Sequence, residues 1–310
     1  MLPYAAKRLT AAVFVVLGVT LATFLLLHLE PGDPARAILG EHASPQAIEA
    51  LRKQWGLDAS LGSQFERFVD QLAHGNLGES FIDQTSTASL IGSRIGQTAA
   101  LVAVATLFAV LISVPLASIA AVRKDRTADH ITRGLSVAGL GLPAFWFGIV
   151  LIEVFALRLH IFPVGGYGSG FTGHARSLVL PALTAAIAII PILVRSLRVG
   201  IIEVSEADFV ATLRSKGLGE TRVLGHVMRN ALIPTLTLLG VNIAYLIGST
   251  VVVERVFDLN GLGSLLLTGI QQRDFPVVQG VTLVFAIGVV LVNLATDLFA
   301  ARLDPRIRLG

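Results

Sequence analysis

The chain has 310 residues, of which 54% are hydrophobic and only 15% are charged, and its formal net charge at pH 7 is +3. Soluble domains carry about 25% charged residues, so this composition indicates an integral membrane protein with no room for a large separate soluble domain. The absence of cysteine excludes disulfides and thiolate metal sites.

Six stretches contain no charged residue and are long enough to cross a bilayer. A helix rises about 1.5 Å per residue, so a hydrocarbon core of about 30 Å needs roughly 20 apolar residues. The stretches are 9–29, 95–122, 134–152, 177–194, 230–253 and 275–296. They predict an all-α fold with six membrane helices.

The distribution of positive charge predicts the orientation of these helices. With the N-terminus inside, fifteen of the 24 Lys and Arg residues fall in the inner segments and nine in the outer ones. Five of those nine lie in one long outer segment, where charge has little influence on orientation. We therefore expect both termini to be cytoplasmic. No small-residue cleavage site follows the first stretch, so we interpret residues 1–29 as an uncleaved anchor.

Residues 30–94 are predicted to form an extracytoplasmic region. Ser44 is suited to cap a helix that begins at Pro45, and a second amphipathic run follows at 64–72. We expect two short surface helices here. Residues 95–310 then form a core of five membrane helices, which includes a cytoplasmic loop at 195–229.

This loop predicts a helix–glycine–helix elbow, residues 205–229. Ser205 is suited to cap the first helix, with Asp208 three residues later, and Gly217 is suited to end it. Val210, Leu213 and Gly217 share one face by their spacing. An apolar stripe is costly to leave in water, so we expect this face to dock either on a partner protein or on the membrane surface.

The last outer segment, 254–274, contains a turn at 260–263 and an apolar run at 264–270. The run is too short to span a bilayer, which favours a re-entrant or interfacial helix.

Motifs along the whole chain, taken in order, carry a resemblance to a known family. They are Pro-Gly-Asp-Pro at 31–34, Gly-Leu-Asp at 56–58, Gly-Asn-Leu-Gly-Glu-Ser at 75–80, Phe-Pro-Val-Gly-Gly at 162–166, Leu-Pro-Ala-Leu-Thr at 180–184, Arg-Asn-Ala-Leu-Ile-Pro at 229–234, Arg-Asp-Phe-Pro-Val-Val-Gln-Gly at 273–280 and Leu-Asp-Pro-Arg-Ile-Arg at 303–308. The chain resembles a B-type permease subunit of the oligopeptide/dipeptide/nickel class of ATP-binding-cassette (ABC) importers.

The resemblance implies a six-helix type I importer fold in a bacterial or archaeal inner membrane. It implies a second homologous permease chain, two ATP-binding subunits that hold the ATP and magnesium, an extracytoplasmic substrate-binding protein and surrounding lipid as partners. No cofactor on this chain and no nucleic acid partner are expected. Peptides are the favoured substrate, and nickel chelates or other small solutes are alternatives.

The resemblance also implies that the elbow couples to the ATPase, with Gly217 as a hinge and Arg214 and Lys216 as flanking contacts. The coupling residues it assigns are Ala211, Thr212, Leu213, Arg214, Ser215, Lys216, Gly217 and Leu218. The family usually has Arg-Thr-Ala-Arg-Ala-Lys-Gly here, so positions 211, 213 and 215 depart from its pattern. Asn76 likewise replaces a usual aspartate.

No Gly-x-x-x-x-Gly-Lys-Ser/Thr loop occurs in the sequence, so the chain has no site of this kind for ATP hydrolysis. No catalytic triad or carboxylate pair stands at an interpretable spacing, and the seven histidines include no pair at i, i+4, which argues against a membrane enzyme and a metal site. A stand-alone secondary transporter remains an alternative, although no internal repeat supports it.

Two acidic residues at membrane depth are candidates for the translocation path. Glu153 lies in the outer third of the third stretch, and Asp297 lies near the inner end of the sixth. The alternatives are ion pairs, between Glu153 and Arg158 and between Asp297 and an arginine near the helix ends.

Overall fold

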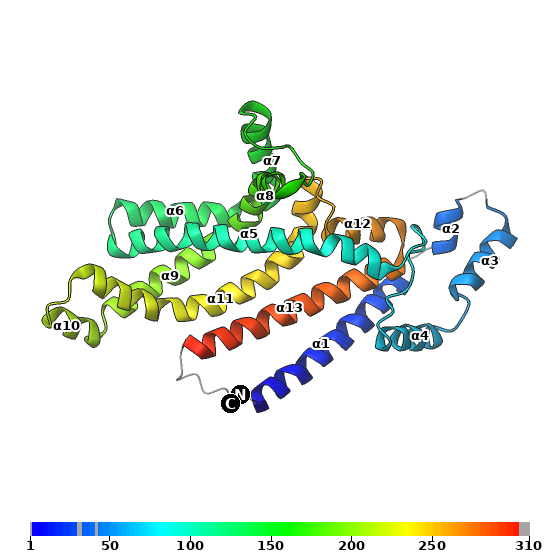
Figure 1. Ribbon diagram of the computed structural model, residues 1–310, viewed down its shortest axis with the longest axis horizontal. Helices are drawn as coiled ribbons and strands as arrows, with labels where there is room; N and C mark the ends of the chain where they lie inside the picture. The colour runs from blue at the N-terminus through cyan, green and yellow to red at the C-terminus, as the bar shows by residue number, and fades with distance from the viewer. Residues whose placement is uncertain (1, 30–32, 41–42, 304–310) are drawn as a thin grey trace. The chain divides into compact units, whose positions relative to one another are not determined.

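The computed structural model describes residues 2–29, 33–40 and 43–303, and every regular element in these ranges is helical (Figure 1). The elements are α1 (Leu2–Leu29), α2 (Pro34–Leu39), α3 (Pro45–Trp55), α4 (Leu61–Ala73), α5 (Thr87–Val122), α6 (Thr127–Gly141), α7 (Ala144–Leu151), the π-helical segment η1 (Ile152–Arg158), α8 (Gly170–Ile187), α9 (Ile190–Ser205), α10 (Asp208–Ser215), α11 (Glu220–Val256), α12 (Leu262–Gln272) and α13 (Phe275–Leu303).

Among the described residues, α5, α11 and α13 are each long and apolar enough to cross a membrane alone. Two further spans are bent pairs of helices, α6 with α7 and η1, and α8 with α9, while the apolar part of α1 described here is shorter, Val13–Leu26. The stretches 134–152 and 177–194, each predicted as one membrane helix, are therefore each divided between successive helices.

Proline accounts for both breaks. Pro143 stands between α6 and α7 with extended backbone, φ −62° and ψ 129°. Pro191 lies in the first turn of α9 and has no N–H to donate to the carbonyl of Ile187, where α8 ends. The α8–α9 pair consequently bends by 59°.

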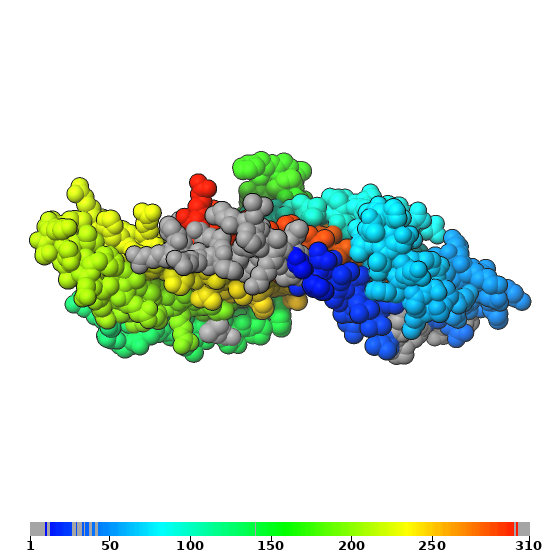
Figure 2. All heavy atoms as spheres, turned by 90° about the horizontal axis from the view of Figure 1, so that it is seen from below, coloured from blue at the N-terminus to red at the C-terminus, as the bar shows by residue number. Residues whose placement is uncertain are grey.

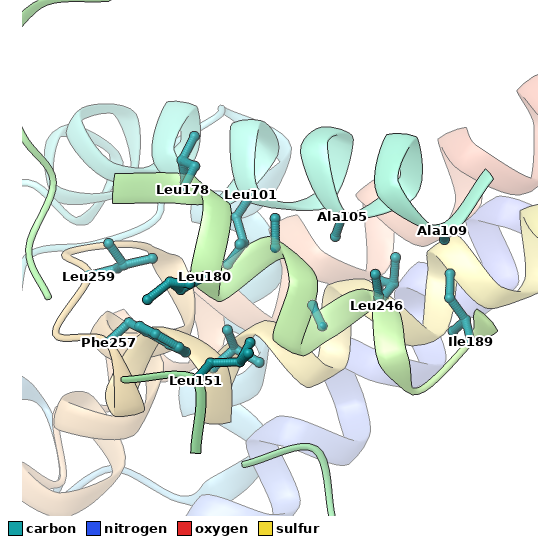
Figure 3. Close-up of a cluster of buried hydrophobic side chains, with 14 of the residues drawn as sticks. Leu101, Ala105, Ala109, Leu151, Leu178, Leu180, Ile189, Leu246, Phe257 and Leu259 are labelled. Atoms are coloured by element: carbon teal, nitrogen blue, oxygen red, sulfur yellow. The ribbon is translucent and has the colours of Figure 1, made fainter. Parts of the chain in front are cut away.

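The chain divides into two compact units, and the first comprises Ala99–Leu259 together with α13 from Val289 onward. Its core joins α5, α7, α8 and α11 through side chains such as Leu101, Leu180, Leu246 and Phe257 (Figure 3). Small residues permit close helix approach in this core. A Cβ added at Gly148 of α7, for example, would lie 2.9 Å from Thr184 of α8.

The second unit comprises Leu2–Thr98 and Asn260–Gly288. The two predicted surface helices are confirmed as α3 and α4, and the Ser44 hydroxyl accepts a hydrogen bond from the Ala47 N–H at 3.2 Å. Phe24 of α1 is buried against Phe65 and Phe68 of α4. The short helix expected at 264–270 is α12.

Candidate functional site

The elbow begins differently from the sequence prediction. Ser205 is the last residue of α9, and its hydroxyl donates to the Ile201 carbonyl of the same helix at 2.6 Å. Ala207 stands at the N-cap of α10 and supplies no side-chain cap. The predicted capping role of Ser205 is therefore wrong, because a serine hydroxyl also bonds well to the preceding turn of its own helix.

The end of α10 confirms the predicted glycine turn. Gly217 has φ +80°, a conformation that glycine adopts without steric cost. Its N–H donates to the Arg214 carbonyl at 2.9 Å, and the Leu218 N–H donates to the Leu213 carbonyl at 3.2 Å, which is the Schellman pattern.

A bidentate ion pair closes the same turn. Arg214 donates to the two carboxylate oxygens of Glu220 at 2.8 and 3.2 Å, and this contact raises the pKa of Arg214 above its usual value. Arg214 is thus engaged within the elbow.

The apolar stripe of α10 packs on the chain itself. Val210 is completely buried, and Leu213 and Leu218 pack beside it. The cluster around them contains Ala117 and Ala121 of α5, Val194, Leu197 and Ile201 of α9, and Val223, Val227 and Ala231 of α11. The stripe was predicted to dock on a partner protein or on the membrane surface. Neither is needed to cover the stripe, because this chain covers it.

The opposite face of α10 is open. Phe209 is 41% exposed, and Ala211, Thr212, Ser215 and Lys216 are exposed around it. The atoms of this segment lie uncovered in the view of Figure 2, where they are yellow-green. Phe209 was not among the residues singled out from the sequence, because a single aromatic residue outside an apolar stripe is no signal of a contact face.

Ion pairs join α9, the helix that leads into the elbow, to α6 and to the turn that precedes α6. Asp129 of α6 has no exposed side-chain surface, and Arg198 of α9 donates to both of its oxygens at 2.6 Å. Lys124, in the turn before α6, donates to Glu206 at 2.9 Å, which raises the pKa of Lys124. Local sequence patterns do not reveal these two pairs, because the partners in each lie far apart along the chain.

Comparison with known families assigns the chain. Residues 113–309 match the model of the binding-protein-dependent transport system inner membrane component, and residues 1–102 match the N-terminal model of the same class of membrane component. The chain belongs to this family. It is a permease subunit of the ABC importer class, as the motifs along the sequence predicted.

Individual relatives agree over the full length of this permease. It is 37% identical over 309 residues to the glutathione transport system permease protein GsiC of Escherichia coli K12, with 99% of both chains covered. It is 37% identical over 329 residues to the probable D,D-dipeptide transport system permease protein DdpB of the same strain, covering 98% of this chain and 97% of the relative.

Solved structures confirm the predicted fold class. An inward-facing form of the MetNI methionine ABC transporter matches with a TM-score of 0.57 at 16% identity, over 69% of this permease and 96% of the compared chain. At this identity the likeness concerns the fold alone.

The two acidic candidates for the translocation path occupy different settings in the permease. Glu153 lies in η1 and accepts from Arg158 at 3.0 Å, with both side chains about half or more exposed, so the ion pair named as its alternative is formed. Asp297 is half-buried within α13. A role for either residue in the translocation path stays a prediction.

Proposed function

We propose that this permease transports short peptides and receives mechanical work at the open face of α10 from an ATP-binding subunit. The choice of substrate is supported by two relatives whose names specify glutathione and D,D-dipeptides, both of which contain peptide bonds. The assignment of the elbow as the contact for the ATP-binding subunit is supported by α10, which packs one face on this chain and leaves the other face exposed.

The assembly that we propose contains a second homologous permease chain, two ATP-binding subunits that hold ATP and magnesium, and an extracytoplasmic binding protein that delivers the solute. Both termini and the elbow then lie on the cytoplasmic side of the inner membrane, in agreement with the excess of positive charge there. Alternating exposure of one cavity follows if nucleotide state and cavity state bias each other.

The packing of α10 suits it to transmit a displacement from the ATP-binding subunit to the membrane helices. Its inner face lies in one apolar cluster with α9 and α11, so α10 cannot shift without moving these helices. From Glu220 in the elbow, α11 continues without interruption for 37 residues, a length of about 55 Å. A displacement at the elbow is therefore carried across the membrane by α11.

One observation carries this proposal: neighbouring residues of α10 have opposite environments. Val210 is fully buried in the chain's own core, while Phe209 is 41% exposed on the other face. Aromatic residues, phenylalanine included, are enriched at protein–protein interfaces relative to the rest of the surface. We assign Phe209 as the anchor for the ATP-binding subunit, with Thr212 and Lys216 beside it.

The test compares Phe209→Ser with Phe171→Ser, which removes another exposed phenylalanine, 89% exposed at the start of α8. We expect the Phe209 variant to reach the membrane normally, but to lose co-purifying ATP-binding subunits and ATP-driven peptide uptake. The Phe171 variant should retain both. Full uptake and co-purification in the Phe209 variant would contradict the proposal.

A further inference from the structure

The second unit contains a cavity of about 720 Å³, a size typical of small-molecule sites. Five segments line it: α1 near its end, the helices α3 and α4, residues 76–84, and the first turns of α13. All of them belong to one compact unit. The coupling role of the elbow makes no use of this cavity.

The walls of the cavity are held in place by specific contacts. Trp55 of α3 stacks on Phe81, with ring centroids 4.1 Å apart and planes 9° from parallel. Asp274 is buried and accepts from the Ser80 hydroxyl at 2.5 Å and from the Phe81 N–H at 3.2 Å. The aromatic wall is therefore fixed both to α3 and to the start of α13.

The polar lining consists mainly of carboxamides. Gln54, Gln71, Gln84 and Gln279 line the cavity, and none of the four makes a side-chain hydrogen bond to another residue in the described part of the chain. The first three are exposed at its margin, whereas Gln279 is only 8% exposed. Its amide atoms are not among the fully buried ones that lack a partner, so they keep accessible surface, and the unpaired amide of Gln279 is available to a ligand in the cavity.

The charged residues of the lining are not arranged to bind an ionic ligand. Arg67 donates to the Gly56 carbonyl at 2.9 Å and to the Ser63 carbonyl at 3.3 Å. Glu79 is exposed. The free hydrogen-bonding groups are thus chiefly neutral carboxamides, each with one acceptor and two donors.

We infer that this cavity is a binding site for short peptides, which it holds by their backbone amides with Gln279 as the buried contact. A peptide group presents one donor and one acceptor, the complement of a carboxamide. Phe24, Phe68 and Phe275 supply apolar surface for peptide side chains. Because the lining is mainly neutral, recognition does not depend on the charged ends of the peptide.

This inference rests on the proposed peptide substrate, but it concerns a site apart from the elbow. The chain has two tryptophans, Trp55 and Trp146. Trp146→Phe therefore leaves Trp55, which lines the cavity, as the sole fluorescent reporter. The full chain in lipid nanodiscs is titrated with tri-alanine, with N-acetyl-tri-alanine amide and, as a carbohydrate comparison, with maltotriose.

We expect both peptides to produce a saturable change in Trp55 emission, with affinities that agree within about threefold because terminal charges are not read. Gln279→Leu should weaken binding at least about tenfold, since a central hydrogen-bonding partner is lost. The matched control is Gln271→Leu, which alters an exposed glutamine of α12 outside the cavity and should leave binding unchanged. If Gln279→Leu fails to fold, Gln84→Leu at the exposed margin serves in its place.

Several outcomes would overturn the inference. They are no saturable response to either peptide, equal binding in the folded Gln279 or Gln84 variant, binding of the charged peptide alone, or equal affinity for maltotriose. A response to the extracytoplasmic binding protein without one to peptides would assign the cavity to a protein segment instead. If any of these occurs while Phe209→Ser still abolishes co-purification of the ATPase, the inference fails and the coupling proposal stands.

Discussion

Arg198 and Asp129, 69 residues apart in the sequence, are joined by two hydrogen bonds of 2.6 Å. The pair connects α9, which leads into the elbow, to the first turn of α6. Arg133 lies 3.5 Å from the same carboxylate, and the Asp125 N–H donates to it at 3.0 Å. Asp129 is thus the common partner of groups on three segments beside the elbow.

We expect Asp129→Ala to lower the free energy of unfolding by about 3 kcal/mol, because it leaves the largely buried Arg198 without its counterion. The control is Glu206→Ala, which breaks a pair whose side chains are about half or more exposed and should have little effect. Thermal unfolding of the full chain in detergent measures both. Equal losses in the two variants would show that Asp129 has no special role.

The proposed hinge at Gly217 can be tested by comparison with Gly219 in the same turn. Gly217 has φ +80°, whereas Gly219 has φ −64°, and an added Cβ meets no atom within 4 Å at either position. Gly217→Ala should therefore cost about 1 kcal/mol of stability from backbone strain alone, and Gly219→Ala should cost less. Gly217→Pro should in addition uncouple ATP hydrolysis from uptake, because proline requires φ near −65°.

The readout for the proline variant is the ratio of ATP hydrolysed to peptide taken up by the assembled transporter in vesicles. Normal uptake at a normal ratio would show that the turn at 217 is not a coupling element.

The sequence predicted the features that local chemistry determines. Charge-free runs indicated most membrane helices, Ser44 and Pro45 indicated the start of α3, and Gly217 indicated the end of α10. Packing between segments far apart in the sequence could not be predicted from these local patterns. The periodicity of Val210 and Leu213 showed a stripe, but not that the stripe is covered by α5, α9 and α11 of the same chain.

The candidate site was accordingly found only in part. The family resemblance proposed the segment 211–218 as the coupling site, which stays a prediction, and it did not name the neighbouring Phe209 on the open face. Pro143 and Pro191 lie within charge-free runs, and such a run does not reveal whether it is one helix or two. Hydrogen bonds such as those of Asp274 to residues 80 and 81 join segments nearly two hundred residues apart, which no local pattern reports.

Close contact between α11 and α13 depends on one glycine. A Cβ at Gly240 would lie only 2.3–2.6 Å from side-chain atoms of Thr296, whereas a Cβ at Gly248 meets nothing within 4 Å. Gly240→Ala should therefore destabilise the protein by about 1–3 kcal/mol through overpacking. Gly248→Ala should be neutral or slightly stabilising, since alanine is the better helix former. Thermal unfolding in detergent separates the two, and similar midpoints would contradict the packing.

Asp274 should keep the turn at residues 80–82 ordered, because its carboxylate accepts hydrogen bonds from these residues. Asp274→Ala removes the acceptor for Ser80, Phe81 and Ile82, and hydrogen bonds to a carboxylate contribute about 2 kcal/mol each. We expect faster hydrogen exchange at the Phe81 and Ile82 amides, measured by mass spectrometry on the full chain in nanodiscs. Exchange in α10, which belongs to the other unit, is the internal control and should not change. Unchanged protection at residues 81 and 82 would refute this role.

The most direct test of the central claim is cross-linking from the open face of α10. Because the chain has no cysteine, Thr212→Cys provides a single thiol on that face, and Val210→Cys provides one on the buried face. With benzophenone-4-maleimide, which alkylates that thiol and on irradiation inserts into a C–H bond of a contacting chain, the assembled transporter should yield a covalent adduct between the residue 212 variant and an ATP-binding subunit, and little from the residue 210 variant. If the thiol at 212 is freely labelled in the active, assembled transporter but never joins an ATP-binding subunit, the elbow is not where that subunit docks.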